Sequence, residues 1–275
     1  MRAGIGSFAF GWAIQQDPAF DEQALVALAV RHGVRVVQLG DNLPAHQMPA
    51  ARFDALVAAC RARRVDLELG ARGLTEAHLD TYLSLCRRAG ARVLRFVADA
   101  PGCEPSSDDL VALLRSAAPE IASAGVVLGL ENHDRFPAAT LRHIVEEVDH
   151  AAVGICLDTA NSLGAGEGLL YVTDLLAPFT VNLHVKDVTI RRVPYQMGFV
   201  VEGCALGRGQ LPIRWTIERV REKGRCGTVI LEGWTRPAAS PDETVRHERA
   251  EVEAGIGVLE RLLAGSVDPP GSSGS

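Results

Sequence analysis

Short apolar stretches alternate with longer stretches of helical periodicity along the chain. Runs rich in β-branched and other apolar residues predict eight strands, at 4–8, 34–40, 66–70, 93–97, 126–131, 153–158, 180–187 and 228–232. Between them, apolar residues recur every three or four positions and predict helices at 21–32, 53–63, 75–89, 107–124, 140–148, 169–177, 212–223 and 242–263. Glycines such as Gly33 and Gly90 follow several of these stretches, where glycine most easily adopts the left-handed conformation that ends a helix. The pattern therefore predicts eight strand–helix units.

Strands that are separated by helices must run parallel, and near-continuous apolar strands are buried on both faces. We therefore expect an α/β fold, a single-domain (β/α)₈ TIM barrel over residues 1–264. An open, doubly wound sheet is the alternative, but the chain has neither G-x-G-x-x-G after its first strand nor a GxxxxGK phosphate loop. Residues 265–275, which end in SVDPPGSSGS, are expected to be a disordered tail or an added linker.

Composition and charge narrow the class of protein. The 275 residues are 47% hydrophobic and 23% charged, and the formal net charge is −6. Nucleic-acid binding usually needs a basic surface, so we expect no nucleic-acid partner. No apolar run approaches the roughly 18 residues that span a bilayer, and the first residues lack the features of a signal peptide. The six scattered cysteines form no C-x-x-C pair, which favours free thiols and a cytoplasmic location without membrane partners.

The segment at 188–211 is too long for an ordinary connection in a compact domain and too apolar for a disordered one. We expect it to act as a lid or as a flap that contacts a partner, which suggests a homodimer contact. The alternative is a structural hairpin packed on the barrel rim.

Ionisable residues stand at or near the ends of four consecutive predicted strands, where TIM barrels carry their working groups. These residues are Glu131 in GLENHD, Asp158 in GICLDTAN, His184 in VNLHVKD and Glu232 in VILEGW. Three buried carboxylates and one imidazole cannot neutralise one another, whereas a divalent cation can neutralise them. The sequence therefore predicts one metal ion. Mn²⁺ is the first expectation, with Mg²⁺, Co²⁺ and Zn²⁺ as alternatives.

Strand alternation places further polar side chains near these four. His184 shares its strand face with Lys186, and Glu131 shares its face with His133. Substrate contacts are therefore expected from these and other residues, namely His133, Asn161, Lys186, Arg191, Arg192, Gln38 and Trp12. Some of them have a structural alternative. His133 could instead support a metal ligand from outside, the two arginines could be a solvated pair, and Trp12, like Trp234, could pack in the core.

The motifs LEN, CLDTAN, NLHVKD, GRG and LEG resemble the xylose-isomerase-like superfamily of sugar phosphate isomerases and epimerases, over about residues 1–264. The resemblance implies one divalent metal on Glu131, Asp158, His184 and Glu232. It also implies that Glu131 and Glu232 are catalytic, on opposite faces of the substrate. One departure is that ketose 3-epimerases carry a histidine where this chain has Asn161. The blocks FAFGWAI, QLGDNLP, LENHDRF and IRRVPYQMGFVVEG look more like a branch that includes 3-oxo-isoapionate decarboxylases.

The expected function is a metal-dependent enzyme that acts on a small keto sugar or sugar acid through a metal-stabilised enediolate. The first expectation is a sugar isomerase or epimerase, in which Glu131 and Glu232 shuttle a proton, and CO₂ loss is the alternative. Loss of CO₂ would give a decarboxylase or related lyase, in which Lys186, Arg191 or Arg192 could hold the substrate carboxylate. A barrel that only binds sugar and an endonuclease-four-like DNA repair enzyme are the less favoured readings. The latter needs more ligands and a basic groove.

Overall fold

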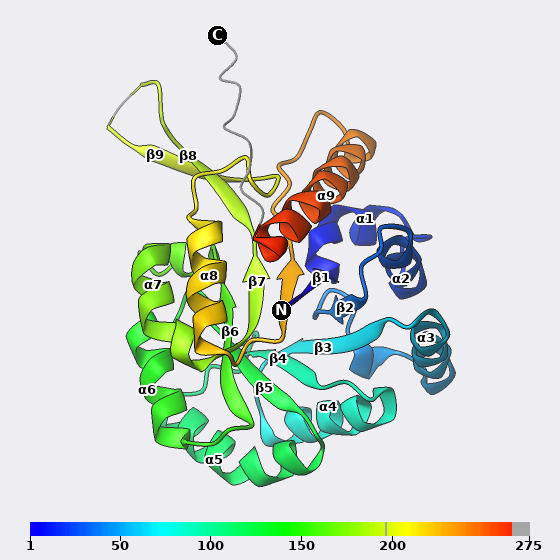
Figure 1. The fold of residues 1–275 in the computed structure, drawn as a ribbon, viewed down its shortest axis with the longest axis vertical. Coiled ribbons are helices and arrows are strands. Elements are labelled where there is room, and N and C mark those ends of the chain that lie inside the picture. Colours follow the sequence, from blue (N-terminus) through cyan, green and yellow to red (C-terminus); the bar gives the residue numbers. More distant parts are fainter. Residues whose placement is uncertain (196, 266–275) are drawn as a thin grey trace.

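Eight parallel strands close into a barrel in the computed structural model, which describes residues 1–195 and 197–265 (Figure 1). The barrel strands are β1 (Arg2–Gly6), β2 (Val36–Leu39), β3 (Asp66–Arg72), β4 (Val93–Val97), β5 (Val127–Glu131), β6 (Val153–Asp158), β7 (Thr180–Val185) and β10 (Thr228–Leu231). Each strand pairs with the next along the chain, and β1 pairs with β10 to close the ring. The predicted TIM barrel is thus confirmed. Residues 266–275 of the predicted tail lie outside the described residues.

Helices surround the barrel and follow the predicted positions closely. They are α2 (Glu22–Arg31), α3 (Ala50–Arg63), α4 (Glu76–Ala89), α5 (Ser107–Ser123), α6 (Ala138–Val148), α7 (Leu169–Leu176), α8 (Ile213–Lys223) and α9 (Pro241–Ala264). Local signals set their ends: Ser106 and Asp109 form a capping box at the start of α5, and α4 ends at Gly90, whose φ is +74°. Among the described residues, no helix is both long and apolar enough to cross a membrane.

One short helix, α1 (Gly11–Gln16), was not predicted. The carboxylate of Glu248 in α9 accepts the backbone N–H groups of Trp12 and Ala13 and so anchors the first turn of α1. This anchor comes from the far end of the chain, and therefore the local pattern does not predict it.

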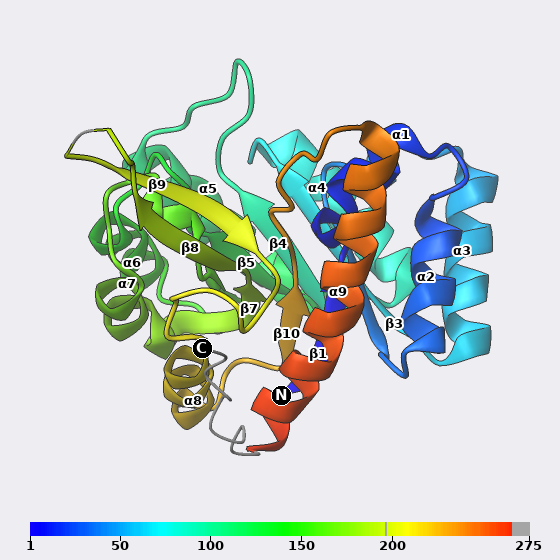
Figure 2. The ribbon, with the colours of Figure 1, turned by 90° about the horizontal axis from the view of Figure 1, so that it is seen from above.

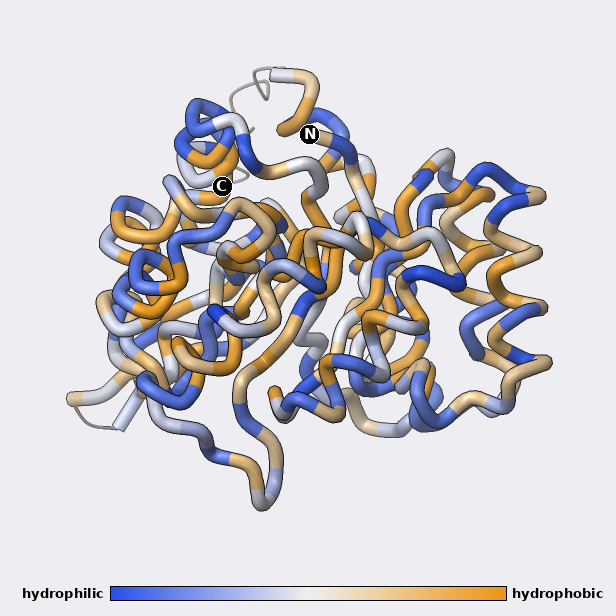
Figure 3. Tube along the Cα trace, turned by 90° about the horizontal axis from the view of Figure 1, so that it is seen from below, coloured by the Kyte–Doolittle hydropathy of each residue, from blue (hydrophilic) through white to orange (hydrophobic). Residues whose placement is uncertain are grey.

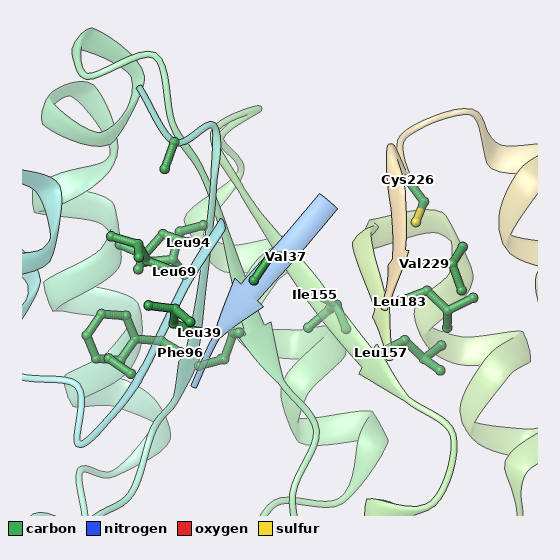
Figure 4. Close-up of a cluster of buried hydrophobic side chains, with 14 of the residues drawn as sticks. Val37, Leu39, Leu69, Leu94, Phe96, Ile155, Leu157, Leu183, Cys226 and Val229 are labelled. Atoms are coloured by element: carbon green, nitrogen blue, oxygen red, sulfur yellow. The ribbon is translucent and has the colours of Figure 1, made fainter. Parts of the chain in front are cut away.

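The hydrophobic core lies between the barrel and the helices. The peripheral helices alternate between hydrophilic and hydrophobic residues, as Figure 3 shows, because one face of each packs inward. Figure 4 shows part of the packed layer, in which Leu39, Leu69, Leu94 and Phe96 from β2, β3 and β4 lie close together. Burial of these side chains on the outer face of the strands leaves the inner face for polar residues.

The inner face carries a polar network below the site. The Gln38 amide donates to Glu68 Oε2 and to Asn182 Oδ1, each at 3.0 Å, and the Thr228 hydroxyl donates to Glu68 Oε1 at 2.8 Å. Because these buried groups satisfy one another, the barrel interior is closed there by paired polar side chains.

The long segment after β7 forms an antiparallel hairpin of β8 (Asp187–Arg192) and β9 (Phe199–Cys204). Figures 1 and 2 show it projecting from the barrel beside β7. Its base lies against the segment after β10, since a Cβ at Gly203 would be only 2.0 Å from the Trp234 carbonyl oxygen. The segment is therefore a hairpin on the barrel rim, and its role as a lid or partner contact stays a prediction.

Candidate functional site

The four predicted metal ligands converge at the carboxyl ends of the strands. Glu131 and Asp158 are the last residues of β5 and β6, His184 lies in β7, and Glu232 directly follows β10. The Nδ1 atom of His184 is 3.7 Å from Glu131 Oε1, 4.0 Å from Asp158 Oδ2 and 3.3 Å from Glu232 Oε1. All four side chains are buried. Parallel strands, whose side chains alternate between the two faces of the sheet, thus bring together residues that are spread over 102 positions of the chain, from Glu131 to Glu232.

The donor set fits a divalent cation. Both ring nitrogens of His184 are buried without a hydrogen-bond partner among the described residues, and one oxygen of each carboxylate has no partner there other than its ion pair with Arg95 or Lys186. Asp158, His184 and Glu232 offer ligand atoms within 4.8 Å of one another, and a second group under the same limit joins Glu131, Cys156 and His184. Carboxylate oxygens with a neutral imidazole suit Mg²⁺, Mn²⁺ or Zn²⁺. A cation held here would bind a ring nitrogen of His184 and would share the carboxylates with Lys186 and Arg95.

Burial sets the protonation of the ligands. Desolvation lowers the pKa of His184 to about 4, which keeps its imidazole neutral and therefore able to bind a metal. Burial also raises the pKa of Glu131, although Arg95 opposes this effect. For Glu232, burial acts in the same direction, but His184, Lys186 and Arg95 outweigh it and lower the pKa. The two glutamates are therefore chemically different.

Two buried cations neutralise much of the acidic charge. Lys186 Nζ lies 2.8 Å from Asp158 Oδ2 and 3.0 Å from Glu232 Oε2. Arg95 Nε lies 2.6 Å from Glu131 Oε2. Burial alone would lower the pKa of Lys186, yet the surrounding carboxylates raise it, so Lys186 stays charged. Sequence analysis missed Arg95, although a single charge inside the apolar run VLRFV was a usable signal.

Hydrogen bonds fix the orientation of Asp158. Its Oδ1 accepts the backbone N–H groups of Ala160 and Asn161 at 2.8 and 2.9 Å, so only Oδ2 faces the other ligands. The Asn132 side chain accepts the N–H of Asp158 at 2.6 Å and donates to its carbonyl oxygen at 2.9 Å. The sequence LDTAN therefore builds a tight turn that aims one oxygen at the cluster. Sequence analysis did not single out Asn132.

A pocket of about 240 Å³ opens onto the cluster. Of the predicted site residues, its wall includes Glu131, His133, Asn161, Lys186 and Glu232. The remaining lining residues, of which only Trp234 was considered from the sequence, are Phe8, Asp41, Arg72, Arg95, Val97, Asp134, Gly164 and Trp234. The Asn161 amide donates to Glu131 Oε1 at 2.9 Å and accepts from Lys186 Nζ at 3.3 Å. Asn161 therefore bridges Glu131 and Lys186 by hydrogen bonds, and its own amide neither gains nor loses a proton.

Four residues predicted to contact substrate are not part of this wall among the described residues. Gln38 faces the barrel interior as expected, but its amide is engaged by Glu68 and Asn182 deeper in the barrel.

The other three lie on outer elements. The indole N–H of Trp12 donates to the carbonyl of Thr235. On the exposed hairpin, Arg191 pairs with Glu202 and Arg192 stacks on the Phe199 ring. The partners of all three side chains thus also lie outside the pocket wall.

Comparison with known proteins gives the chain its family. Residues 2–262 match the family described as xylose isomerase-like TIM barrel. The chain is 33% identical over 256 residues to a 3-oxo-isoapionate decarboxylase of Pectobacterium atrosepticum, and the match covers 91% of this chain and 92% of that protein.

Among solved structures, a D-psicose 3-epimerase in the presence of D-fructose superposes with a TM-score of 0.71 at 14% identity, covering 97% of this chain and all of that chain. A xylose isomerase-like TIM barrel protein from Mycobacterium smegmatis in complex with magnesium gives a TM-score of 0.67 at 15% identity, covering 94% of this chain and 97% of that chain. At such identities these two structures show the fold alone. The match to the family over nearly the whole barrel establishes that this chain belongs to the xylose isomerase-like TIM barrel family.

Proposed function

We propose that this protein is a divalent-metal-dependent enzyme that removes CO₂ from a small 3-oxo sugar acid. The observation that carries the proposal is the buried convergence of Glu131, Asp158, His184 and Glu232, where Glu131 and Glu232 line a pocket and the ring nitrogens of His184 have no hydrogen-bond partner among the described residues. The 33% identity to a 3-oxo-isoapionate decarboxylase over most of both chains supports this reaction and substrate class.

Decarboxylation requires that the negative charge left on the substrate is stabilised and that one proton is then delivered to it. Loss of CO₂ from a 3-oxo acid leaves its bonding electron pair on the adjacent carbon, shared with the ketone oxygen. Glu131, Asp158, His184 and Glu232 would hold a divalent ion, which would supply Lewis-acid chemistry at that oxygen. Lys186 and Arg95, both buried and charged, add fixed positive charge at the same place. In a water-poor pocket such preorganised charge is worth more than in solvent.

The electron-rich carbon must then receive a proton. Burial raises the pKa of the Glu131 carboxyl, and this side chain reaches the pocket wall. We assign delivery of this proton to Glu131, whose Oε1 accepts from Asn161 and lies 3.7 Å from His184 Nδ1 while Oε2 is paired with Arg95.

Asn161 favours CO₂ loss over epimerisation. Epimerisation requires groups that remove a proton from carbon and replace it on the other side. At the position where ketose 3-epimerases carry a histidine, Asn161 offers only hydrogen bonds, to Glu131 and from Lys186.

The test is incubation of Mn²⁺-loaded protein with a panel of 3-oxo sugar acids and keto sugars, with both CO₂ release and new isomers measured. We expect CO₂ release from at least one acid, its loss after chelation, and its loss in Asp158→Asn. Arg92→Ala is the control, because Arg92 is exposed and directly precedes β4, at the end of the strand that lies away from the site. New isomers without CO₂ would refute decarboxylation, and CO₂ release that chelation leaves unchanged would refute metal dependence.

A ketose epimerase is the second candidate, because Glu131 and Glu232 both line the pocket from separated strands and could exchange a proton with opposite faces of a sugar. Incubation in D₂O separates the two reactions. Deuterium incorporated into a keto sugar that was supplied as substrate would favour the epimerase. CO₂ release from an acid, with deuterium only in the product of that release and none in a supplied keto sugar, would favour the decarboxylase.

A further inference from the structure

Three cations line the pocket, and they differ in how they are paired. Lys186 is engaged by Asp158 and Glu232, and Arg95 by Glu131 and Asp41. Arg72 has no carboxylate within ion-pair distance among residues 1–195 and 197–265. Its positive charge is therefore the least compensated of the three, and the one with which a bound anion would pair.

The fold holds Arg72 in place. It is the last residue of β3 and pairs across the sheet with Val97 of β4. Its Nε donates to the carbonyl oxygen of Asp99 at 3.1 Å. Asp134 also lines the pocket; its carboxylate is engaged by His133, whose hydrogen bond lowers the pKa of Asp134 most, and the more distant charge of Arg72 lowers that pKa further. The terminal nitrogens of Arg72 thus belong to an anchored, half-buried side chain, which loses little conformational freedom when an anion binds.

We infer that Arg72 binds the carboxylate of the substrate and thereby selects a sugar acid over a neutral keto sugar. The inference rests on the proposed function, because it assumes that the ketone of the same substrate lies at Glu131, Asp158, His184 and Glu232. A guanidinium presents two parallel N–H donors to a carboxylate, which gives both affinity and orientation.

The expected effect of Arg72 on KM and kcat follows from what happens to the carboxylate charge during the reaction. The carboxylate leaves as neutral CO₂, so the attraction to Arg72 is strongest before the reaction and weakens as the carbon–carbon bond breaks. An interaction of this kind lowers KM and does not raise kcat. Arg72→Ala should therefore raise KM by about tenfold to a hundredfold, the range for a charge-assisted hydrogen bond, while kcat stays equal or rises.

A binding experiment tests Arg72 without turnover. The probes are 5-hydroxy-4-oxopentanoate and its neutral amide, which share a hydroxyketone and differ in charge; the acid does not lose CO₂ readily because its carboxylate is one carbon further from the ketone. Their affinities for Mn²⁺-loaded protein are measured by calorimetry. Dihydroxyacetone phosphate is the third probe, since a guanidinium also binds phosphate.

We expect wild-type protein to bind the acid about tenfold or more tightly than the amide, and Arg72→Ala to bind the two about equally. Arg72→Lys should restore part of the preference, because it keeps the charge without the planar fork. Arg92→Ala is the control, since this exposed arginine precedes β4 at the other end of the barrel.

Equal binding of acid and amide by wild type, or an unchanged preference in Arg72→Ala, overturns the inference. An Arg72-dependent preference for the phosphate alone also overturns it, because the residue would then select a phosphate. If Arg72 governs acid binding but no acid releases CO₂, the proposed reaction fails and the carboxylate site stands.

Discussion

Replacement of Lys186 by methionine tests how the acidic cluster is neutralised. The Lys186 ammonium lies 2.8 and 3.0 Å from carboxylate oxygens of Asp158 and Glu232, and only 7% of its side chain is exposed. Methionine fills a similar volume but removes the charge. Removing one partner of a buried ion pair costs about 3–5 kcal/mol, because the remaining charges stay buried without compensation. We therefore expect Lys186→Met to lose about that much free energy of unfolding in metal-free protein.

A divalent ion should reverse much of this loss. Ligand at a hundred times its Kd stabilises a protein by about 2.7 kcal/mol. Removal of a neighbouring positive charge should tighten metal binding, so a fixed Mn²⁺ concentration should stabilise Lys186→Met more than wild type. The assay is urea unfolding with a chelator and with Mn²⁺. Lys223→Met is the control, because it changes the other lysine of the chain, which is exposed at the end of α8.

Two results would refute this reasoning. The first is a metal-free Lys186→Met protein within about 1 kcal/mol of wild type, well below the expected cost of breaking a buried pair. The second is equal stabilisation of both proteins by Mn²⁺, which would mean that the ion binds away from Lys186.

Three further predictions concern the surroundings of the site. Asn132→Ala removes the hydrogen bonds that orient Asp158, so calorimetry should show Mn²⁺ affinity about 10–100-fold lower, and an unchanged Kd would contradict the orienting role. Burial raises the pKa of Glu68 from 4.5 to about 7, against hydrogen bonds that lower it, so the folded protein keeps a proton that the unfolded chain releases between these values. Stability should fall by about 3 kcal/mol as the pH rises through this window, and urea unfolding of Glu68→Gln should lack that part of the fall; parallel pH profiles would contradict it. Gly203→Ala places a Cβ about 2.0 Å from the Trp234 carbonyl oxygen, so the melting temperature should drop in line with a loss of about 1–3 kcal/mol, whereas an unchanged Tm would show that the hairpin base does not pack there.

The fold could be predicted from the sequence because each barrel unit repeats the same local physics. Apolar β-branched runs and helical stripes recur at regular spacing, and the predicted strand at 93–97 matches β4 to the residue. The strand ranges of the hairpin were not predicted. Helix α1 was not predicted either, because it depends on Glu248 from the opposite end of the chain.

The site could be predicted only as far as strand faces and strand ends define it. The ends of β5 and β6 point to Glu131 and Asp158 directly. The two-residue period of a strand predicts on which face a side chain lies, but neither how deep in the barrel it lies nor which residue it contacts. Gln38 lies near the end of β2, yet it pairs with Glu68, four residues before the end of β3, because the strands of a barrel are staggered. The same stagger hides which inner residues, such as Arg95, reach the pocket.

Anomalous diffraction at the manganese edge from Mn²⁺-loaded crystals tests the central claim most directly. The account predicts a peak about 2.0–2.6 Å from side-chain oxygens of Glu131, Asp158 and Glu232 and from a ring nitrogen of His184. It also predicts that Asp158→Asn weakens or abolishes this peak. A peak at other residues, or none between these four at saturating Mn²⁺, would contradict the account.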